Sequence, residues 1–159
     1  MKIREYKPMD CAAMAELFYN TVHTINAGDY TDEQLDAWAT GNIDLAVWNC
    51  SFLEHNTLIA ESDGIVVGFA DMDKTGYLDR LYVHRDFQRR GIATALINEL
   101  ERRARKAGIL NFETYASITA RPLFEKQGYT VETENKDIRN GIILLNYKMI
   151  KRCSIMDSY

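Results

Sequence analysis

The stretch that decides the fold is residues 81–94, which read LYVHRDFQRRGIAT. The first residues, Leu81-Tyr82-Val83, are apolar and include an aromatic and a β-branched side chain, which predicts a strand. A short basic loop follows, and from Gly91 small and apolar residues open a helix. The first amides of a helix have no acceptor within it, and the helix dipole adds partial positive charge there. The stretch therefore predicts a strand–loop–helix unit with an anion site at its turn.

A phosphate group is the anion that this turn favours. Gly91 and Ala93 leave room for a phosphate to approach the backbone, and Arg89 and Arg90 add formal charge. The spacing Gln88-x-x-Gly91-x-Ala93 differs from GxxxxGK[ST] and from GxGxxG, which disfavours a nucleoside triphosphate or dinucleotide site. The alternative is that Gly91 only starts the helix and the arginines are solvated. The position directly before the longest amphipathic helix favours phosphate binding.

The elements on both sides of this stretch predict an α/β (α+β) single domain with a mixed sheet. Apolar spacing and turn residues such as Asp63-Gly64 and Asn140-Gly141 define them. We expect the domain to span residues 1–150, followed by a loose tail over residues 151–159. The predicted strands are 3–6, 57–61, 65–71, 77–83, 109–116, 129–136 and 142–150, and the predicted helices are 10–28, 32–38, 45–52, 91–108 and 119–127.

Composition restricts the class of protein. The chain has 159 residues, of which 47% are hydrophobic and 26% charged, as in one ordinary globular domain. Three cysteines without CxxC spacing argue against a disulfide framework or a zinc ribbon, and three scattered histidines leave no predicted metal site. A net charge of -4 disfavours nucleic acid and anionic membranes as partners. The charged amino terminus is unlike a signal peptide, so we expect a cytoplasmic protein that does not span a membrane.

Two segments together resemble the GNAT superfamily of N-acetyltransferases, with most similarity to uncharacterised bacterial members. Residues 88–93, preceded by Leu81-Tyr82-Val83, resemble the acyl-CoA-binding motif of that superfamily. Residues 116–129 (ASITARPLFEKQGY) resemble its next signature, a short helix that ends in Gly-aromatic. The resemblance covers nearly the whole chain. It implies a mostly antiparallel central sheet that splays between two central strands and is flanked by helices.

The resemblance also implies a cosubstrate and a reaction. Acetyl-CoA would place its pyrophosphate on the amides of residues 89–94, and its pantetheine arm would bond to main-chain groups of Leu81 and Val83, like an added strand. A primary amine of a small molecule or peptide would attack the thioester directly. The implied cosubstrate-binding residues are Leu81, Tyr82, Val83, Gln88, Arg89, Arg90, Gly91, Ile92, Ala93, Thr94 and Ser117.

A general base has to take a proton from the ammonium form of the acceptor. The two-residue period of a strand predicts that Tyr77, Asp79, Leu81 and Val83 share one face, on which family members often carry an acidic residue. Asp79 is therefore the candidate base, unless it only pairs with an arginine or lines the slot passively. The outside candidates for the base are Asp71, Asp73 and Glu61.

The leaving-group acid departs from the family pattern. Phe124 stands where a tyrosine is common, and its ring cannot donate a proton. The thiolate then leaves unassisted, which its modest pKa permits, or Tyr115 or Tyr77 assists it. Tyr129 is expected in the core. Candidates for the wall of an acceptor pocket in the amino-terminal helical part are His23, Tyr30, Trp38 and Trp48, but aromatic residues at helical spacing are more often core, which we expect for Trp48 and Phe18.

Phe124 keeps an alternative function open, a non-catalytic acyl-CoA-binding or regulatory module. A third hypothesis is a protein-interaction domain that uses the exposed edge of the last hairpin at residues 142–145. Burial of that apolar strand explains the same residues better, and a homodimer through it is a further possibility.

Overall fold

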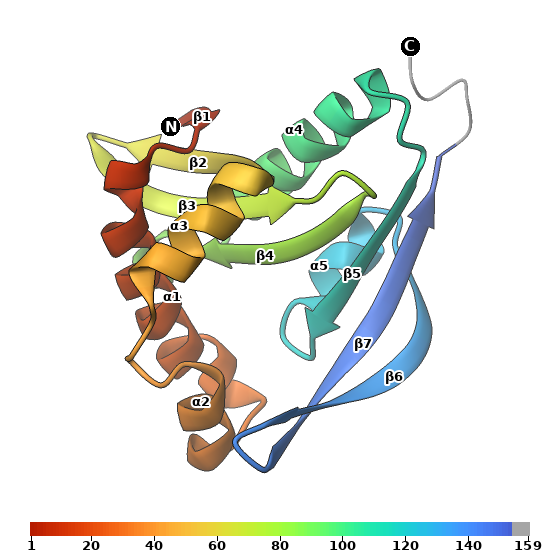
Figure 1. Ribbon diagram of the computed structural model, residues 1–159. Coiled ribbons are helices and arrows are strands. Elements are labelled where there is room, and N and C mark those ends of the chain that lie inside the picture. The colour runs from red at the N-terminus through yellow and green to blue at the C-terminus, as the bar shows by residue number, and fades with distance from the viewer. Residues whose placement is uncertain (154–159) are drawn as a thin grey trace.

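Seven strands form one sheet in the computed structural model, which describes residues 1–153, and helices cover both of its faces (Figure 1). The strands are β1 (Lys2–Glu5), β2 (Asn56–Ser62), β3 (Ile65–Met72), β4 (Tyr77–Val83), β5 (Asn111–Ser117), β6 (Thr130–Arg139) and β7 (Ile142–Arg152). The helices are α1 (Cys11–Thr24), α2 (Asp32–Trp38), α3 (Leu45–Glu54), α4 (Ile92–Lys106) and α5 (Arg121–Lys126).

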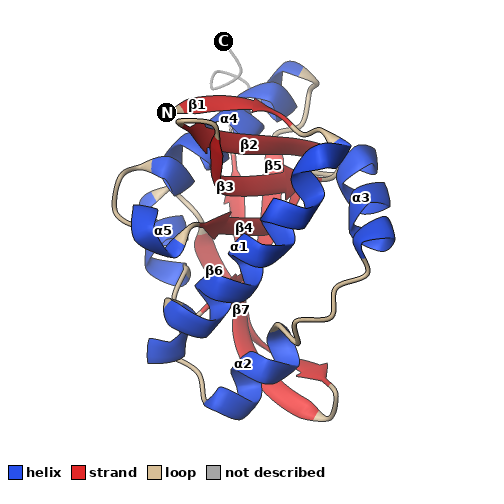
Figure 2. Ribbon diagram, turned by 90° about the vertical axis from the view of Figure 1, so that its left-hand side faces the viewer, coloured by secondary structure: helices blue, strands red, loops and turns tan. Residues whose placement is uncertain are grey.

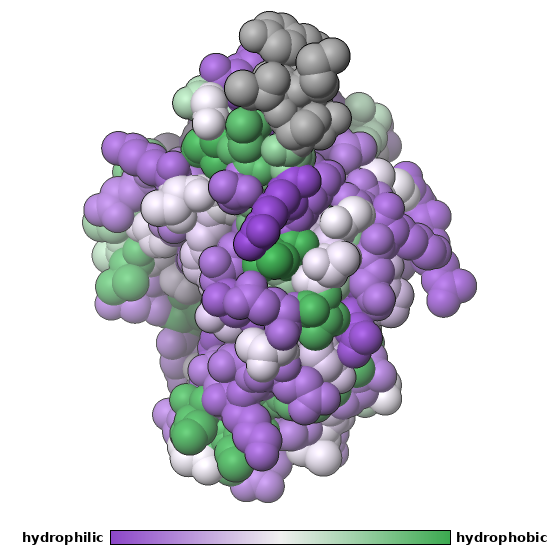
Figure 3. All heavy atoms as spheres, turned by 90° about the vertical axis from the view of Figure 1, so that its right-hand side faces the viewer, coloured by the Kyte–Doolittle hydropathy of each residue, from purple (hydrophilic) through white to green (hydrophobic). Residues whose placement is uncertain are grey.

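The order of strands in the sheet is β1-β2-β3-β4-β5-β7-β6. Neighbouring strands are antiparallel except β4 and β5, which are parallel because α4 crosses over between them. The mixed, mostly antiparallel sheet is as predicted. Residues 142–145 of β7 pair with β6 alone, because the pairing of β7 with β5 starts only at Asn146. Side chains of the amino-terminal segment bond the other side of these residues, Tyr30 at the Leu145 carbonyl and Gln34 at the Ile143 carbonyl. Of the four residues only Leu144 is buried, so the expected burial of this strand holds for that residue. Figure 3, which views the side of the molecule where β6 and β7 lie, is hydrophilic over most of its area.

Two apolar clusters hold the helices against the sheet. On one face Leu96, Ile97 and Leu100 of α4 are fully buried against Val67 and Ala70. On the other face α1, α2 and α3 cover the sheet, and their apolar side chains, among them Met14, Leu17, Leu35 and Phe52, pack on Ile59 and Phe69 (Figure 2). The helices of the first cluster support β4 and β5 from one side, and those of the second close the space from the other.

The two predicted turns are left-handed, as their residues favour. Asp63 and Gly64 have φ of 51° and 77°, and Asn140 and Gly141 have φ of 52° and 77°. The predicted tail was wrong at its start, because Lys151 and Arg152 are the last residues of β7 and pair with Phe112 and Asn111. Residues 154–159 of that tail lie outside the described residues. Within the described part of the chain, no helix has the length and apolar character needed to cross a membrane.

Candidate active site

β4 and β5 separate soon after they meet, and this opens a slot in the middle of the sheet. Their pairing consists of Tyr77 with Glu113 and Leu78 with Thr114. The Thr114 hydroxyl donates to the Leu78 carbonyl at 2.9 Å and is buried, so it closes the narrow end of the slot. The splay between two central strands, expected from the resemblance, is therefore present.

The main chain of β4 presents hydrogen-bonding groups to this slot. The His84 amide donates to the Val67 carbonyl, and Val83 lies opposite Gly68, so Val83 and Leu81 are the residues whose amides and carbonyls point away from β3. The Val83 carbonyl accepts from the Thr21 hydroxyl at 3.0 Å and from Gln88 Nε2 at 2.8 Å. No strand of the described chain takes the Val83 amide or the Leu81 amide and carbonyl, so these three groups are open to a ligand.

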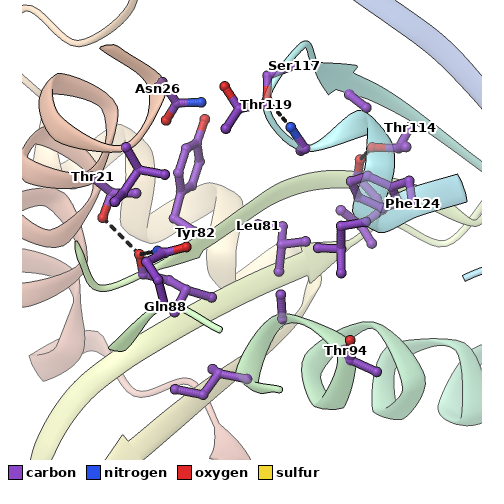
Figure 4. A pocket seen from close by; sticks show the side chains of 18 of the residues that line it. Thr21, Asn26, Leu81, Tyr82, Gln88, Thr94, Thr114, Ser117, Thr119 and Phe124 are labelled. Atoms are coloured by element: carbon purple, nitrogen blue, oxygen red, sulfur yellow. Dashed lines mark hydrogen bonds between the residues drawn. The ribbon is translucent and has the colours of Figure 1, made fainter. Parts of the chain in front are cut away.

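The slot is a cavity of about 850 Å³ that reaches from β5 to the start of α4. Leu81 and Tyr82 point to opposite sides of β4, Tyr82 toward Asn26 and Thr119 (Figure 4). Arg90 is not among the lining residues, because its guanidinium lies over the Phe87 ring at 4.7 Å. The other predicted cosubstrate-binding residues all line the slot: Leu81, Tyr82, Val83, Gln88, Arg89, Gly91, Ile92, Ala93, Thr94 and Ser117.

The turn before α4 has the shape of an anion cradle. Arg89 and Gly91 are left-handed, with φ of 60° and 78°, and the chain therefore turns sharply into the helix. A Cβ atom added to Gly91 would meet no atom within 4 Å, so the space in front of the first amides is open. The amides of Gly91, Ile92, Ala93 and Thr94 lie at the helix start, where the helix provides no acceptor. Open space, free amides and the nearby Arg89 fit a phosphate group.

A second cavity of about 380 Å³ adjoins the slot. The β6–β7 hairpin and β5 form much of its wall, and Tyr30 and Tyr77 line it together with Asp137 and Arg139. It shares Trp38, Asp79, Tyr82, Tyr115 and Ser117 with the slot. A group bound in the slot and a molecule in the second cavity would therefore meet at this shared wall.

A β-bulge sets the position of Asp79 at the shared wall. Asp71 pairs with Arg80, but Met72 pairs with Leu78, so Asp79 is an extra residue on β4. The prediction that Tyr77, Asp79, Leu81 and Val83 share one face was therefore wrong. Leu78, not Asp79, joins Leu81 and Val83 in the cluster under α4. The bulge leaves the Asp79 side chain 35% exposed at the junction of the two cavities.

A charged network lies directly behind Asp79. The fully buried Asp71 accepts from Arg80 Nη2 at 2.6 Å and bonds His55 Nδ1 at 2.7 Å. Arg80 Nη2 also reaches the Ser51 hydroxyl at 2.6 Å and lies 3.5 Å from Asp79 Oδ2. His55, Arg80 and Ser51 were not predicted from the sequence, because α3 and β4 come together only in the folded chain and no local motif marks these residues.

The pKa values of Asp79 and His55 are both raised. Burial of the carboxylate, and next the negative charge of Asp71, raise the pKa of Asp79 above that of an ordinary aspartate. The positive charges of Arg80 and His55 lower it by a smaller amount. The hydrogen bond to Asp71 raises the pKa of His55. His55, Asp71 and Asp79 hold donor atoms within 4.8 Å of one another, but the Arg80 guanidinium already supplies the charge that a metal ion would bring.

The outside candidates for the base do not reach the cavities. Asp71 is fully buried and bound by Arg80 and His55. Asp73 accepts from the amides of Thr75 and Tyr77 within its own turn. Glu61 pairs with Arg4 of β1. Asp79 is therefore the carboxylate of the four that faces both cavities.

Several hydroxyl groups surround the shared wall. Tyr115 lines both cavities, Tyr77 lines the second one, and their rings are 6.1 Å apart. Tyr82 accepts from Trp38 Nε1 at 3.2 Å, and burial raises the pKa of Tyr82 to about 12. The Ser117 hydroxyl accepts from the Ala120 amide at 3.0 Å, so this side chain supports the turn before α5.

Phe124 and Tyr129 belong to the core. Phe124 is 2% exposed and lines the slot with an apolar ring, as its residue type dictates. Tyr129 packs against it at 5.1 Å and donates to buried Glu101 at 2.8 Å, which confirms its predicted place in the core. Neither side chain offers a free proton to a group in the slot.

Comparison with known proteins agrees with this geometry. Residues 26–151 match the family described as Acetyltransferase (GNAT) domain. The uncharacterized N-acetyltransferase YafP of Escherichia coli is 30% identical over 150 residues, which cover 94% of each chain. The crystal structure of a GCN5-related N-acetyltransferase from Rhodopseudomonas palustris superposes with a TM-score of 0.91 at 36% identity, over 95% of this chain and 94% of that one. PaiA N-acetyltransferase from Thermoplasma acidophilum, solved in complex with coenzyme A, has a TM-score of 0.79 at 21% identity, over 95% and 98% of the two chains.

Proposed function

Because this chain belongs to the GNAT acetyltransferase family, whose cosubstrate is acetyl-CoA, we propose that it transfers the acetyl group to a primary amine held in the second cavity. One observation carries the proposal. The slot, which begins at the free amides of α4, meets the second cavity at a wall where Asp79 is exposed to both. A thioester in the slot and an amine in the second cavity would react at that wall.

Acetyl-CoA would lie along β4 with its diphosphate at the start of α4. The amides of residues 91–94 and the charge of Arg89 would bind the diphosphate, and Arg90 would add charge from its place over Phe87. The free amide of Val83 and the amide and carbonyl of Leu81 would bond the pantetheine arm. Gln88 would act indirectly, because its side chain holds the Val83 carbonyl and orders the turn.

Asp79 would act as the general base. The acceptor enters as an ammonium ion, which aromatic walls and a carboxylate attract. Asp79 takes one proton from it through water, and the neutral nitrogen attacks the thioester carbonyl to form the C–N bond. The C–S bond then breaks and coenzyme A leaves as a thiolate, while the new C–N nitrogen gives up its second proton, which the thiolate takes up by way of a hydroxyl group or water, so that the products are the neutral amide and the thiol. The raised pKa of Asp79 supports the base role, because it makes the carboxylate a stronger base than an ordinary aspartate.

The departing thiolate does not require a strong acid, because thiol pKa values of about 8.5 make it a good leaving group. Tyr115 is the donor that we propose, since it lines both cavities, and Tyr77 is its neighbour on the acceptor side. Burial raises the pKa of Tyr77, so its hydroxyl keeps its proton at neutral pH. The phenyl ring of Phe124 would only shape the slot.

Two measurements on the full chain test the proposal. Calorimetry with acetyl-CoA measures binding to the slot, and a thiol-release assay over a panel of primary amines measures transfer. We expect binding in both wild type and Asp79→Asn, with thiol release in the wild type alone. Binding without release for every amine would favour a non-catalytic acyl-CoA-binding module, the second function that Phe124 leaves open. Absence of binding would overturn both.

A further inference from the structure

We propose that the acceptor amine also carries a carboxylate, which Arg139 binds at the hairpin side of the second cavity. This inference rests on the function proposed above and narrows its acceptor to a small zwitterion of the amino-acid type. Two features of the cavity lead to it: a charge of each sign in its wall, and a guanidinium whose outer nitrogens are free.

Arg139 is the cation in the wall of the second cavity. Its Nε donates to Asp137 Oδ2 at 2.8 Å, and its side chain is 49% exposed. Among residues 1–153, no side chain or carbonyl accepts from its two Nη atoms. A guanidinium held through Nε still presents a pair of parallel N–H groups, which match the two oxygens of a carboxylate.

The remaining charges favour an anion over a second cation at this place. Asp137 and Arg139 compensate each other's charge through one contact, Arg139 Nε to Asp137 Oδ2, which leaves one carboxylate oxygen but both Nη groups, so the pair presents more hydrogen-bond donors than acceptors to the cavity. Asp79 is the carboxylate left for the reacting ammonium, on the β4 side of the cavity. A ligand with one ammonium and one carboxylate complements Asp79 and Arg139 together, and burying both pairs favours it over a simple amine.

The hairpin that carries Arg139 is held in place against the amino-terminal helices. The Tyr30 hydroxyl donates to the Leu145 carbonyl at 2.7 Å, and Gln34 Nε2 donates to the Ile143 carbonyl at 2.9 Å. Figures 1 and 2 both show α2 beside the end of the β6–β7 hairpin. Arg139 therefore belongs to a supported element and keeps its place in the cavity wall.

The size and walls of the second cavity define the rest of the acceptor. A volume of about 380 Å³ holds a small molecule and excludes a folded protein surface. Rings of Tyr30, Trp38, Tyr77, Tyr82 and Tyr115 line it, so a flat or apolar side chain between the two charged groups would pack well. We therefore expect free amino acids or similar amino carboxylates.

Matched acceptors test the inference in the thiol-release assay with saturating acetyl-CoA. The probes are phenylalanine, phenylalaninamide and phenethylamine; methionine, methioninamide and 3-methylthiopropylamine; and 4-aminobutanoate, butylamine and butane-1,4-diamine. Each set keeps the amine and removes or replaces the carboxylate. The variants are Arg139→Gln and Arg139→Lys, with Arg102→Gln as the control because Arg102 is an equally exposed arginine, 48%, on α4.

We expect wild type to have a KM for at least one amino carboxylate roughly tenfold to a hundredfold below that of its carboxylate-free partners, as for a charge-assisted hydrogen bond. Arg139→Gln should remove that difference by raising KM for the carboxylate alone, Arg139→Lys should restore part of it, and Arg102→Gln should change nothing. Equal KM values within every set, or a better diamine, would overturn the inference while leaving acetyl transfer intact. Absence of transfer to all probes would overturn the proposed function and this inference with it.

Discussion

Asp79, the proposed general base, occupies the extra position of a β-bulge at the wall shared by both cavities. Replacement by asparagine keeps the shape of the side chain and removes its basicity. We expect Asp79→Asn to lower kcat roughly a hundredfold to ten-thousandfold, with little change in acetyl-CoA affinity. Asp63→Asn is the control, since position 63 lies in an exposed left-handed turn that asparagine tolerates.

The pH dependence of the same reaction provides a second prediction for this residue. A base works only when it is deprotonated, and the pKa of Asp79 is raised by its surroundings and by Asp71. kcat/KM should therefore fall as the pH drops through a value above the ordinary aspartate pKa of about 3.9. If the Asp79→Asn variant showed the same decrease of kcat/KM at low pH as wild type, the titration of another group would cause that decrease.

His55 allows the charged network to be tested through stability. Its folded-state pKa is raised by the bond to Asp71, so protonated His55 stabilises the fold below the unfolded pKa of about 6.5, and this contribution is lost as pH rises through the folded pKa. Urea unfolding of wild type and His55→Gln should therefore differ more at about pH 5.5 than at about pH 9. A difference independent of pH would mean that packing alone, not charge, ties His55 to Asp71.

Residue roles could be predicted from the sequence only where local pattern determines them. The strand and the motif that follows it place Asp79 and the residues of the α4 turn beside the slot, and the structure has them there, although not on the face expected for Asp79. The bulge at Asp79 depends on how β3 and β4 align, and the sequence pattern does not contain that register. His55, Arg80 and Ser51 lie on different elements, so their convergence is a property of the packed fold.

At the scale of elements, the turn into α4 is the proposed binding site for the diphosphate of the cosubstrate. Gly91 precedes the first residue of α4, and Gly108 lies just after its last turn. Both glycines are left-handed, with φ of 78° and 88°, and a Cβ atom added to either would meet no atom within 4 Å. Alanine should cost about 1 kcal/mol of stability at each position for the same backbone reason. Only the methyl group at position 91 would stand where the diphosphate is proposed to bind.

Calorimetry with acetyl-CoA separates the two glycine variants. We expect Gly91→Ala to weaken binding by roughly tenfold or more and Gly108→Ala to leave it unchanged, while both lose similar stability in urea. Equal acetyl-CoA affinity in the two variants would show that the diphosphate does not bind at the start of α4. The comparison does not depend on which amine the protein acetylates.

The elements themselves were largely readable from the sequence, because apolar period, turn residues and caps are local. Both predicted hairpin turns are examples and are present, and the Thr31–Gln34 capping box at the start of α2 is an equally local signal. The end of β7 was missed because Lys151 and Arg152 pair with β5, and pairing between distant strands outweighs their polar character. The residue at which β4 leaves β5 was not predictable for the same reason.

At the scale of the whole molecule, the sheet has two halves, β1–β4 and β5–β7, which pair over a short vertex and diverge toward an open end. A second set of hydrogen bonds connects the molecule across that open end. The vertex is the pairing of residues 77–78 with residues 113–114 and the buried Thr114 bond. At the open end, the Tyr30 hydroxyl donates to Leu145 and accepts from the Ile118 amide at 2.9 Å. Tyr30 thereby connects the amino-terminal helices to the β5–β7 half and sets the width of the second cavity.

Removing the Tyr30 hydroxyl tests this arrangement. Tyr30→Phe leaves the ring in place but deprives the Leu145 carbonyl and the Ile118 amide of their partner, so we expect a loss of about 1–3 kcal/mol in the free energy of unfolding. Because Tyr30 lines the second cavity and not the slot, the KM for the acceptor should rise several-fold while acetyl-CoA affinity stays within twofold, as for loss of about one hydrogen bond. Tyr19→Phe, on an exposed tyrosine of α1, is the control. If Tyr30→Phe weakened the binding of acetyl-CoA and of the acceptor equally, the hydrogen bonds of Tyr30 would support the whole sheet and would not shape the acceptor cavity alone.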